Sequence, residues 1–211
     1  KLINEHLASA CKEFGLGMGL GSCRILLEDE SYLKDFAVRH KMGPNQPLYA
    51  NLGIAQLEKT AAEGSWQSIE RMMDMLEADG LIIHVNPFQE WLQPEGDRIN
   101  RRPIDVIQDV ASNINRPLIV KEVGQGMGPE SLKALMQMDV VIEFGAYGGT
   151  NFSQLEINRS AEEKGQIYGE ISHLGHTAEE MISYVNELLK MRFMKSKGFI
   201  ISGGIKSFLD G

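Results

Sequence analysis

LIIHVNPFQE, residues 81–90, begins as an apolar strand and ends in a cluster of polar side chains. Because side chains alternate between the two faces of a strand, Ile82, His84 and Asn86 are expected on one face. That face is apolar at its start and hydrogen-bonding at its C-terminal end, where Pro87 ends the strand. Such a gradient is typical of a barrel strand that runs from the core to a ligand site. The alternative for the polar end is an exposed loop without a ligand.

Five further runs have the apolar composition of strands, and stretches with helical periodicity lie between them. In residues 103–114 apolar side chains recur at i, i+3, i+4 and i+7, which places them on one helical face, and residues 66–77 show the same spacing. Thr177 and Glu180 form a capping-box pattern that opens another helix. The five runs are residues 14–20, 48–52, 118–123, 140–144 and 198–202.

Strand centres recur about every 20 to 40 residues with a helix between them, which is the βαβ repeat of a parallel sheet. A doubly wound sheet would have its glycine fingerprint after the first strand, whereas here glycine and polar residues follow nearly every strand. A (β/α)8 barrel has its site on that whole ring of strand ends. We therefore predict an α/β protein with the (β/α)8 TIM-barrel fold.

The chain of 211 residues is shorter than the roughly 250 residues of a complete barrel. It starts without methionine and stops inside a segment with helical periodicity that follows a strand. We therefore expect a single barrel domain over residues 1–211 that is truncated at both ends, without an N-terminal segment and the last strand.

The composition argues against several classes of protein. Lys and Arg total 21 against 29 Asp and Glu, and no block of Lys and Arg offers the phosphate footprint of a general nucleic-acid-binding protein. No run approaches the roughly 20 apolar residues of a membrane span, and no signal-peptide pattern opens the chain. We expect a cytoplasmic protein without nucleic-acid or membrane partners. Cys11 and Cys23 lie outside any CxxC spacing and are expected to be ordinary thiols.

Lys121 lies inside the apolar run LIVKEVG, residues 118–124. An ammonium group in such a strand is costly unless an anion or a polarised acceptor meets it. Alternation directs Glu122 to the opposite face, so it is not the expected partner. A ligand in the site and a salt bridge to a different strand remain the two explanations.

Two glycine-rich loops, FGAYGGTN and ISGGI, each follow an apolar strand in the second half of the chain. Gly148, Gly149, Gly203 and Gly204 would let backbone N–H groups converge on an anion, and barrels often bind phosphate after their last two strands. Thr150 adds a hydroxyl donor. Single glycine turns are common, so it is the pair of loops that indicates a phosphate site.

GLGSCR places Ser22 and Arg24 after the first glycine-rich run. An arginine at this place is able to bind a phosphate through two hydrogen bonds. The alternative is a helix N-cap serine and a surface arginine. Asn51, which ends LYAN, completes the ring of polar strand ends.

In chain order, HVNPFQE, QPEGDR, VKEVGQGM, GGTNF and SGGI resemble the type 2 isopentenyl-diphosphate isomerases, and GLGMGLGSCRILLED and ANLGIAQL also look like segments of that family. The resemblance covers nearly the whole chain. It implies a barrel that binds FMN and uses Mg²⁺ and reduced flavin to interconvert isopentenyl and dimethylallyl diphosphate in isoprenoid biosynthesis. NADPH would be needed to reduce the flavin. The family also implies a cytoplasmic homotetramer or a larger homo-oligomer.

The resemblance assigns roles residue by residue. Glu90 would bind the magnesium that bridges to the diphosphate, and Gln89 would lie by the alkene. Lys121 would stabilise the anionic reduced flavin, so Gln89 and Lys121 are the expected catalytic residues. Because glutamine does not titrate, reduced FMN itself is expected to move the protons. FMN would be held by Ser22, Asn51, Lys121, Thr150, Gly203, Gly204 and Ile205. The substrate would be bordered by Ser22, Cys23, Arg24, His84, Asn86 and Gln89.

Some family features are absent from the sequence, namely the N-terminal Arg/Lys diphosphate clamp and the methionine-threonine-glycine-glycine flavin loop. Gly145 stands where some relatives offer a serine to FMN, and His173 and His176 receive no role.

Two other functions fit a barrel of this kind. One is an FMN-dependent oxidoreductase of the hydroxy-acid oxidase or dihydroorotate dehydrogenase type, for which Cys23 is the only cysteine near the predicted site. The other is a non-catalytic barrel that binds phosphate ligands.

Overall fold

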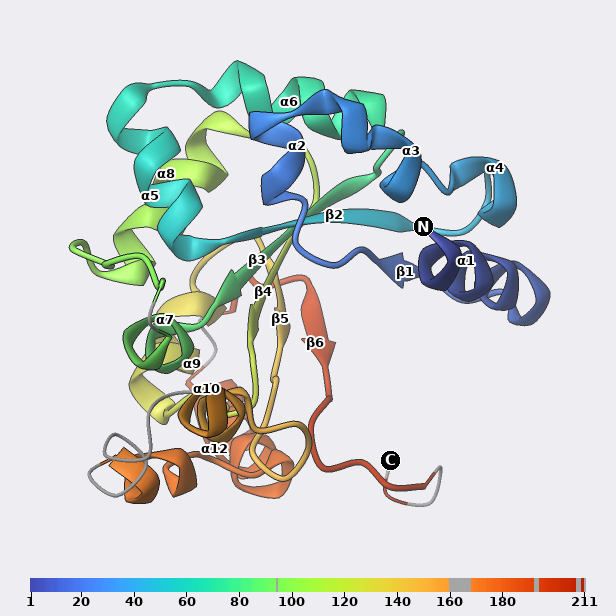
Figure 1. Cartoon of the computed structure of the whole chain (residues 1–211). Helices are drawn as coiled ribbons and strands as arrows, with labels where there is room; N and C mark the ends of the chain where they lie inside the picture. The colour runs from blue at the N-terminus through green and yellow to red at the C-terminus, as the bar shows by residue number, and fades with distance from the viewer. Residues whose placement is uncertain (94, 160–167, 192–193, 208–209, 211) are drawn as a thin grey trace.

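The computed structural model describes the chain except residues 94, 160–167, 192–193, 208–209 and 211. Its centre is a six-stranded sheet whose order follows the chain, from β1 to β6 (Figure 1). Every neighbouring pair of strands is parallel. The strands are Met18–Gly19 (β1), Leu48–Gly53 (β2), Gly80–Val85 (β3), Leu118–Glu122 (β4), Val141–Glu143 (β5) and Gly198–Ile200 (β6).

Helices connect each strand to the next, and α5, α8 and α9 pack in succession beside the sheet (Figure 1). The helices from the N-terminus to β3 are α1 (Leu2–Phe14), α2 (Arg24–Glu28), α3 (Leu33–Phe36), α4 (Arg39–Met42), α5 (Ile54–Glu63) and α6 (Trp66–Met75). Those after β3 are α7 (Pro87–Leu92), α8 (Pro103–Asn113), α9 (Pro129–Met136), α10 (Phe152–Arg159) and α12 (Ala178–Leu189). Short 3-10 helices span Glu30–Tyr32 and Gly169–His173. None of the helices in the described residues is both long and apolar enough to cross a membrane.

Local chemistry sets several of the helix ends. Pro87, Pro103 and Pro129 open α7, α8 and α9, where the missing N–H of proline costs no hydrogen bond. The predicted capping box is confirmed at α12, because Glu180 N donates to Thr177 Oγ1 over 3.3 Å and Thr177 N donates to Glu180 Oε2 over 2.8 Å. These residues therefore define where α7, α8, α9 and α12 begin after the loops that precede them.

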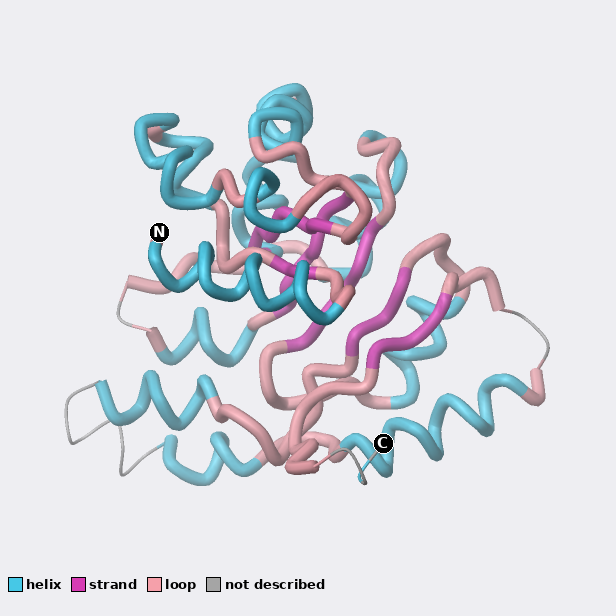
Figure 2. The backbone as a smooth tube through the Cα atoms, turned by 90° about the vertical axis from the view of Figure 1, so that its right-hand side faces the viewer, coloured by secondary structure: helices cyan, strands magenta, loops and turns pink. Residues whose placement is uncertain are grey.

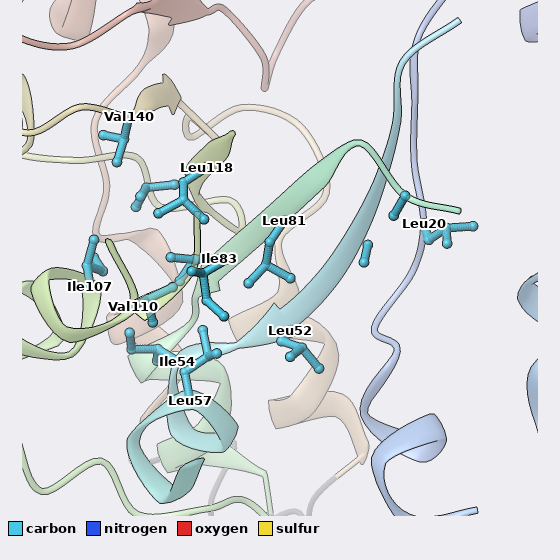
Figure 3. Packing of buried hydrophobic residues seen from close by; sticks show 14 of the residues in the cluster. Leu20, Leu52, Ile54, Leu57, Leu81, Ile83, Ile107, Val110, Leu118 and Val140 are labelled. Atoms are coloured by element: carbon cyan, nitrogen blue, oxygen red, sulfur yellow. The ribbon is translucent and has the colours of Figure 1, made fainter. Parts of the chain in front are cut away.

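The core lies between the sheet and the helices. Ile83 and Val120 on the strands, Leu57 on α5 and Val110 on α8 are fully buried. Figure 3 shows side chains of this cluster meeting between β2, β3 and the neighbouring helices. This apolar packing covers the outer face of the sheet, so a ligand site formed by the strands has to use the inner face or the strand ends.

The sheet is strongly curved. Flat strands roughly 4.8 Å apart would separate β1 and β6 by roughly 24 Å, yet residues of all six strands line one hollow of about 510 Å³. We call this hollow on the inner face the lumen. Figure 2 shows the strands changing direction across the molecule, with helices around them.

The α/β class and the parallel order agree with the sequence prediction, and the structure is a curled half-barrel. Within the described residues β1 pairs only with β2 and β6 only with β5, so closure into a (β/α)8 barrel remains a prediction. The predicted strand 14–20 is shortened to Met18–Gly19. The predicted strand 198–202 ends at Ile200, where the first glycine of the ISGGI loop is still three residues away.

Candidate active site

The inner face changes from apolar to polar over two residues along the strands. The register of β2 to β6 aligns one row, the lower row, as Asn51, Ile82, Ile119, Val141 and Gly198. It aligns the next row, the upper row, as Gly53, His84, Lys121, Glu143 and Ile200. The gradient predicted for β3 is therefore confirmed, and it extends to β4 and β5.

The lumen lies in front of both rows. Its lining includes Ile82, Ile119 and Val141 from the lower row together with Lys121 and Glu143 from the upper row. Its volume of about 510 Å³ falls within the roughly 300–1,000 Å³ of small-molecule sites. The lumen thus offers an apolar floor with two opposite charges at one end.

His84 is held in one tautomer. Asn51 Nδ2 donates to Leu20 O over 2.9 Å, so Asn51 Oδ1 is left to accept from His84 Nδ1 over 2.7 Å. Burial, and to a smaller extent the Lys121 ammonium, lower the pKa of His84 from 6.5 to about 4. His84 is therefore neutral at pH 7, with an acceptor lone pair on Nε2. The ring occupies the space that a side chain at Gly53 would fill, since a Cβ there would lie 2.8 Å from Nε2.

Lys121 faces the lumen, and its Nζ donates to Glu122 O over 3.1 Å. No ion pair joins it to any residue in the described part of the chain. The salt bridge to a different strand, one of the two explanations for a lysine in this strand, is thus not formed among these residues. Two of its three N–H donors remain for a ligand or water.

Glu122 points to the opposite face of β4, as predicted. Its Oε2 accepts from the backbone N–H groups of Val123, Gly124, Gln125 and Gly126, over 2.6, 2.8, 2.6 and 3.2 Å. Burial raises the pKa of Glu122, and the four N–H groups act in the opposite direction. The carboxylate therefore fixes the loop that follows Lys121.

A continuous hydrogen-bond network crosses the strand ends from Arg24 to Glu156. Arg24 Nη1 contacts Asp97 Oδ2 over 2.6 Å, and Asp97 N donates to Glu90 Oε2 over 2.8 Å. Asn86 Nδ2 donates to Glu90 Oε1 over 2.9 Å and to Gln89 Oε1 over 3.2 Å. Gln89 Nε2 donates to Glu156 Oε1 over 3.3 Å. The structure thus brings Arg24, Asn86, Gln89 and Glu90 together, while their roles toward a substrate and a metal stay predictions.

The donor set of this network suits a hard cation that also binds a ligand. Asn86 is 3% exposed, and its Oδ1 has no hydrogen-bond partner among the described residues. Each oxygen of Glu90 accepts one hydrogen bond and keeps a lone pair. The described residues contain no cluster of three His, Cys, Asp or Glu side chains for a metal. Mg²⁺ needs only one or two carboxylates when phosphate oxygens and water complete its shell, so Glu90 and Asn86 fit that ion.

The two predicted glycine loops lie against each other. Gly148, Gly203 and Gly204 have φ of 116°, 90° and 77°, a region that residues with side chains rarely adopt. A Cβ at Gly149 would lie 3.1 Å from Gly204 N, so even one methyl group would crowd the contact. The two loops therefore pack directly against each other, while the convergence of their N–H groups on an anion stays a prediction.

Several residues that were predicted to contact the ligands lie at the surface of the protein. Ser22, Thr150 and Ile205 are exposed, and the backbone oxygen of Thr150 packs against Gly124 in the loop after β4. Ser22 is not a helix cap, because α2 has Cys23 at that position. Arg24 is half exposed and is already paired with Asp97.

Cys23 is fully buried, and burial raises the pKa of its thiol to about 11. Its Sγ contacts Gly21 O over 3.4 Å. Such a thiol is neither a thiolate nucleophile nor a useful acid at pH 7. This agrees with the expectation of an ordinary thiol.

Sequence reasoning missed two acidic residues, Glu143 and Glu156, and the contact that a third, Asp97, makes. Glu143 shares a strand face with Val141, so the alternation that found His84 would also have found it. Asp97 stands in the loop QPEGDR, where its contact with Arg24 joins residues 73 positions apart. Glu156 gives no local signal, because it reaches Gln89 only through the packing of α10 on α7.

A scan against protein-family models gives no match. The chain is 34% identical over 210 residues to a curated protein of Methanosarcina barkeri and 35% identical over 211 residues to one of Rickettsia africae. Both alignments cover 99% of this chain, and they cover 55% and 59% of the two relatives. The chain thus spans little more than half the length of these curated relatives. Along nearly its whole length, including both rows and the network at the strand ends, the chain is similar to proteins named isopentenyl-diphosphate delta-isomerase.

Proposed function

We propose that this chain carries the flavin and diphosphate site of a type 2 isopentenyl-diphosphate isomerase, which interconverts isopentenyl and dimethylallyl diphosphate in isoprenoid biosynthesis. One observation carries the proposal. The upper row, with its charged Lys121 and Glu143, and the network from Arg24 to Glu156 lie at the same edge of one parallel sheet. His84 on β3 and Asn86, the residue after this strand, connect the two. The similarity to proteins of that name along 99% of the chain supports it.

FMN is the proposed occupant of the lumen. The Lys121 side chain, a cation, lines the lumen. The two glycine loops pack against each other and are of the kind that binds phosphate through backbone N–H groups. When bound and reduced, FMN would supply the acid and base chemistry that moves the protons. The residues proposed to hold it are Ser22, Asn51, Lys121, Thr150, Gly203, Gly204 and Ile205.

The diphosphate and Mg²⁺ are proposed to bind at the network on the strand ends. Glu90 and Asn86 Oδ1 offer hard oxygen ligands, and Arg24 offers a guanidinium group beside them. Neutral His84 offers only an acceptor at Nε2, so its contact with a diphosphate needs either a proton or a bridging water. Ser22 and Cys23 are proposed to border the same substrate.

The protein's own part in the reaction is to position and to exclude water. Gln89 cannot titrate, and its amide is fixed from both ends by Asn86 and Glu156, so it can orient an alkene without taking its proton. Lys121 holds a positive charge beside the flavin. The inert Cys23 thiol argues against the oxidoreductase alternative, which needs a base or a thiol acid near its substrate. As parts of the same proposal, NADPH reduces the flavin before turnover, and the working unit is a homotetramer or a larger homo-oligomer.

An assay with the purified full chain tests the proposal. With FMN, NADPH and Mg²⁺, it should convert isopentenyl diphosphate to dimethylallyl diphosphate without net consumption of NADPH beyond the initial reduction of the flavin. Flavin binding is measured in parallel by quenching of FMN fluorescence. An FMN-independent conversion, or saturable binding of diphosphates without any flavin binding, would contradict the proposed function.

A further inference from the structure

Lys121 and Glu143 stand opposite each other on neighbouring strands and line the same lumen. Opposite charges in such cross-strand positions lie within reach and attract each other. Nevertheless, the charged atoms of the two side chains are more than 4.0 Å apart, and neither side chain forms an ion pair with any described residue. The ammonium instead donates to Glu122 O over 3.1 Å, and a separate contact orients the Glu143 carboxylate.

That contact comes from Ser202, in the loop after β6. Its Oγ donates to Glu143 Oε1 over 3.0 Å and accepts from Gly145 N over 3.0 Å. Because the Gly145 N–H occupies an oxygen lone pair, the hydroxyl proton is left to point at the carboxylate. Ser202 thus fixes both the place and the direction of its hydrogen bond to Glu143.

The backbone of Ser202 is itself fixed. Ala146 N donates to Ser202 O over 2.9 Å. The next residue, Gly203, has a φ of 90°, and a Cβ there would lie 2.1 Å from Ala146 O. Only glycine allows the two loops to approach this closely, so the serine cannot drift away from Glu143 without opening the glycine contact.

We propose that Ser202 is a positioning residue that keeps Glu143 from pairing with Lys121, so that the ammonium stays available to an anionic group in the lumen. Without the Ser202 hydroxyl, the carboxylate turns to its cross-strand neighbour and competes with that ligand. The identity of the anionic group as FMN rests on the proposed function, whereas the positioning of Glu143 does not.

Acylation of Lys121 in the ligand-free chain tests the positioning directly. Acetic anhydride reacts with the uncharged amine, and mass spectrometry gives the rate at Lys121. Ser202→Ala should slow this rate about threefold, the effect of one cross-strand charge pair. The double variant Ser202→Ala/Glu143→Gln should restore the original rate, because the amide has no charge to pair. Ser202→Thr keeps a hydroxyl and should react like the unaltered chain.

Circular dichroism identifies variants that fold, and Glu143→Gln alone provides a second test if Ser202→Ala does not fold. Because Ser202 already holds the carboxylate away, Glu143→Gln should leave the acylation rate nearly unchanged. An unchanged rate in a folded Ser202→Ala variant, or a rate that Glu143→Gln raises severalfold, would overturn the proposal.

FMN titration separates this inference from the proposed function. Ser202→Ala should weaken FMN binding about threefold, and the added Glu143→Gln should restore it. If no variant binds FMN, the proposed function fails, while the acylation rates still decide whether Ser202 controls Glu143. If FMN binds but the added Glu143→Gln does not restore the affinity that Ser202→Ala lowers, the positioning role of Ser202 is wrong and the proposed flavin site is retained.

Discussion

Lys121 and Glu122 are neighbours in sequence, but they lie on opposite faces of β4 and differ in how fully the protein satisfies them. One oxygen of Glu122 accepts from four backbone N–H groups. Lys121 donates once, to a backbone oxygen, and otherwise faces the lumen. On the outer face the Glu122 carboxylate makes its hydrogen bonds within the protein. On the inner face the Lys121 ammonium keeps N–H donors for a ligand. The difference separates structural charges from functional ones.

The largest expected effect lies on the outer face. Glu122→Ala would leave four N–H groups of a buried loop without their acceptor, and we expect it to lower the free energy of unfolding by about 3 kcal/mol or more. Urea denaturation measures the loss. Glu122→Gln keeps an acceptor oxygen and should lose less than half as much. Equal losses for both variants would mean that the negative charge, rather than the hydrogen bonds, holds the loop.

A substitution of Lys121 on the inner face should change ligand affinity and leave the free energy of unfolding nearly constant. Lys121→Ala removes an ammonium that no described side chain pairs, so we expect FMN affinity to fall about tenfold or more while the free energy of unfolding stays nearly constant. Fluorescence titration and urea denaturation together make the comparison. Lys133→Ala, on the exposed side of α9, is the matched control. A Lys121→Ala variant with unchanged FMN affinity would remove the distinction between the two faces.

The pH dependence of the free energy of unfolding tests a second polar residue of the inner face, His84. Its pKa in the folded chain is about 4, against 6.5 for the free side chain. Below pH 6.5 the unfolded chain takes up a proton that the folded chain refuses, so His84 lowers stability as pH falls from 6.5 towards 4, by at most about 1.4 kcal/mol per pH unit. His84→Gln should flatten the dependence of the unfolding free energy on pH in that window. A slope that the substitution leaves unaltered would show that His84 titrates normally.

The smallest expected effect concerns the network at the strand ends. Glu90→Gln keeps the hydrogen bonds in part but removes a charge, and we expect the Mg²⁺ concentration for half-maximal activity to rise about fivefold. Glu95→Gln is the control, since Glu95 is exposed and pairs with Arg159. Identical Mg²⁺ titrations for Glu90→Gln and the unaltered chain would reassign Glu90 to a purely structural role in holding the loop at Asp97.

Much of the fold could be predicted because its signals are local. Strand and helix alternate along the chain, and that alternation alone indicates a parallel sheet in chain order. The alternation of side chains on a strand also located His84 and Lys121 on the inner face. Sheet closure could not be settled in this way, because it depends on what pairs with the edges at β1 and β6.

The candidate site was predictable only where one strand or loop carried the signal. Glu143 obeys the same alternation as His84 and was overlooked, whereas Glu156 reaches Gln89 through the packing of two helices that no local pattern encodes. The pairing of His84 with Asn51 depends on the register between β2 and β3, which fixes the tautomer of the histidine. Contacts of this kind follow from tertiary structure alone.

A crystal structure of the full chain with FMN tests the central claim most directly. We predict that the flavin lies in the lumen within hydrogen-bond distance of Lys121 Nζ and that its phosphate lies at the two glycine loops. Flavin density at any other place, or an empty lumen at a saturating concentration of FMN, would contradict the account.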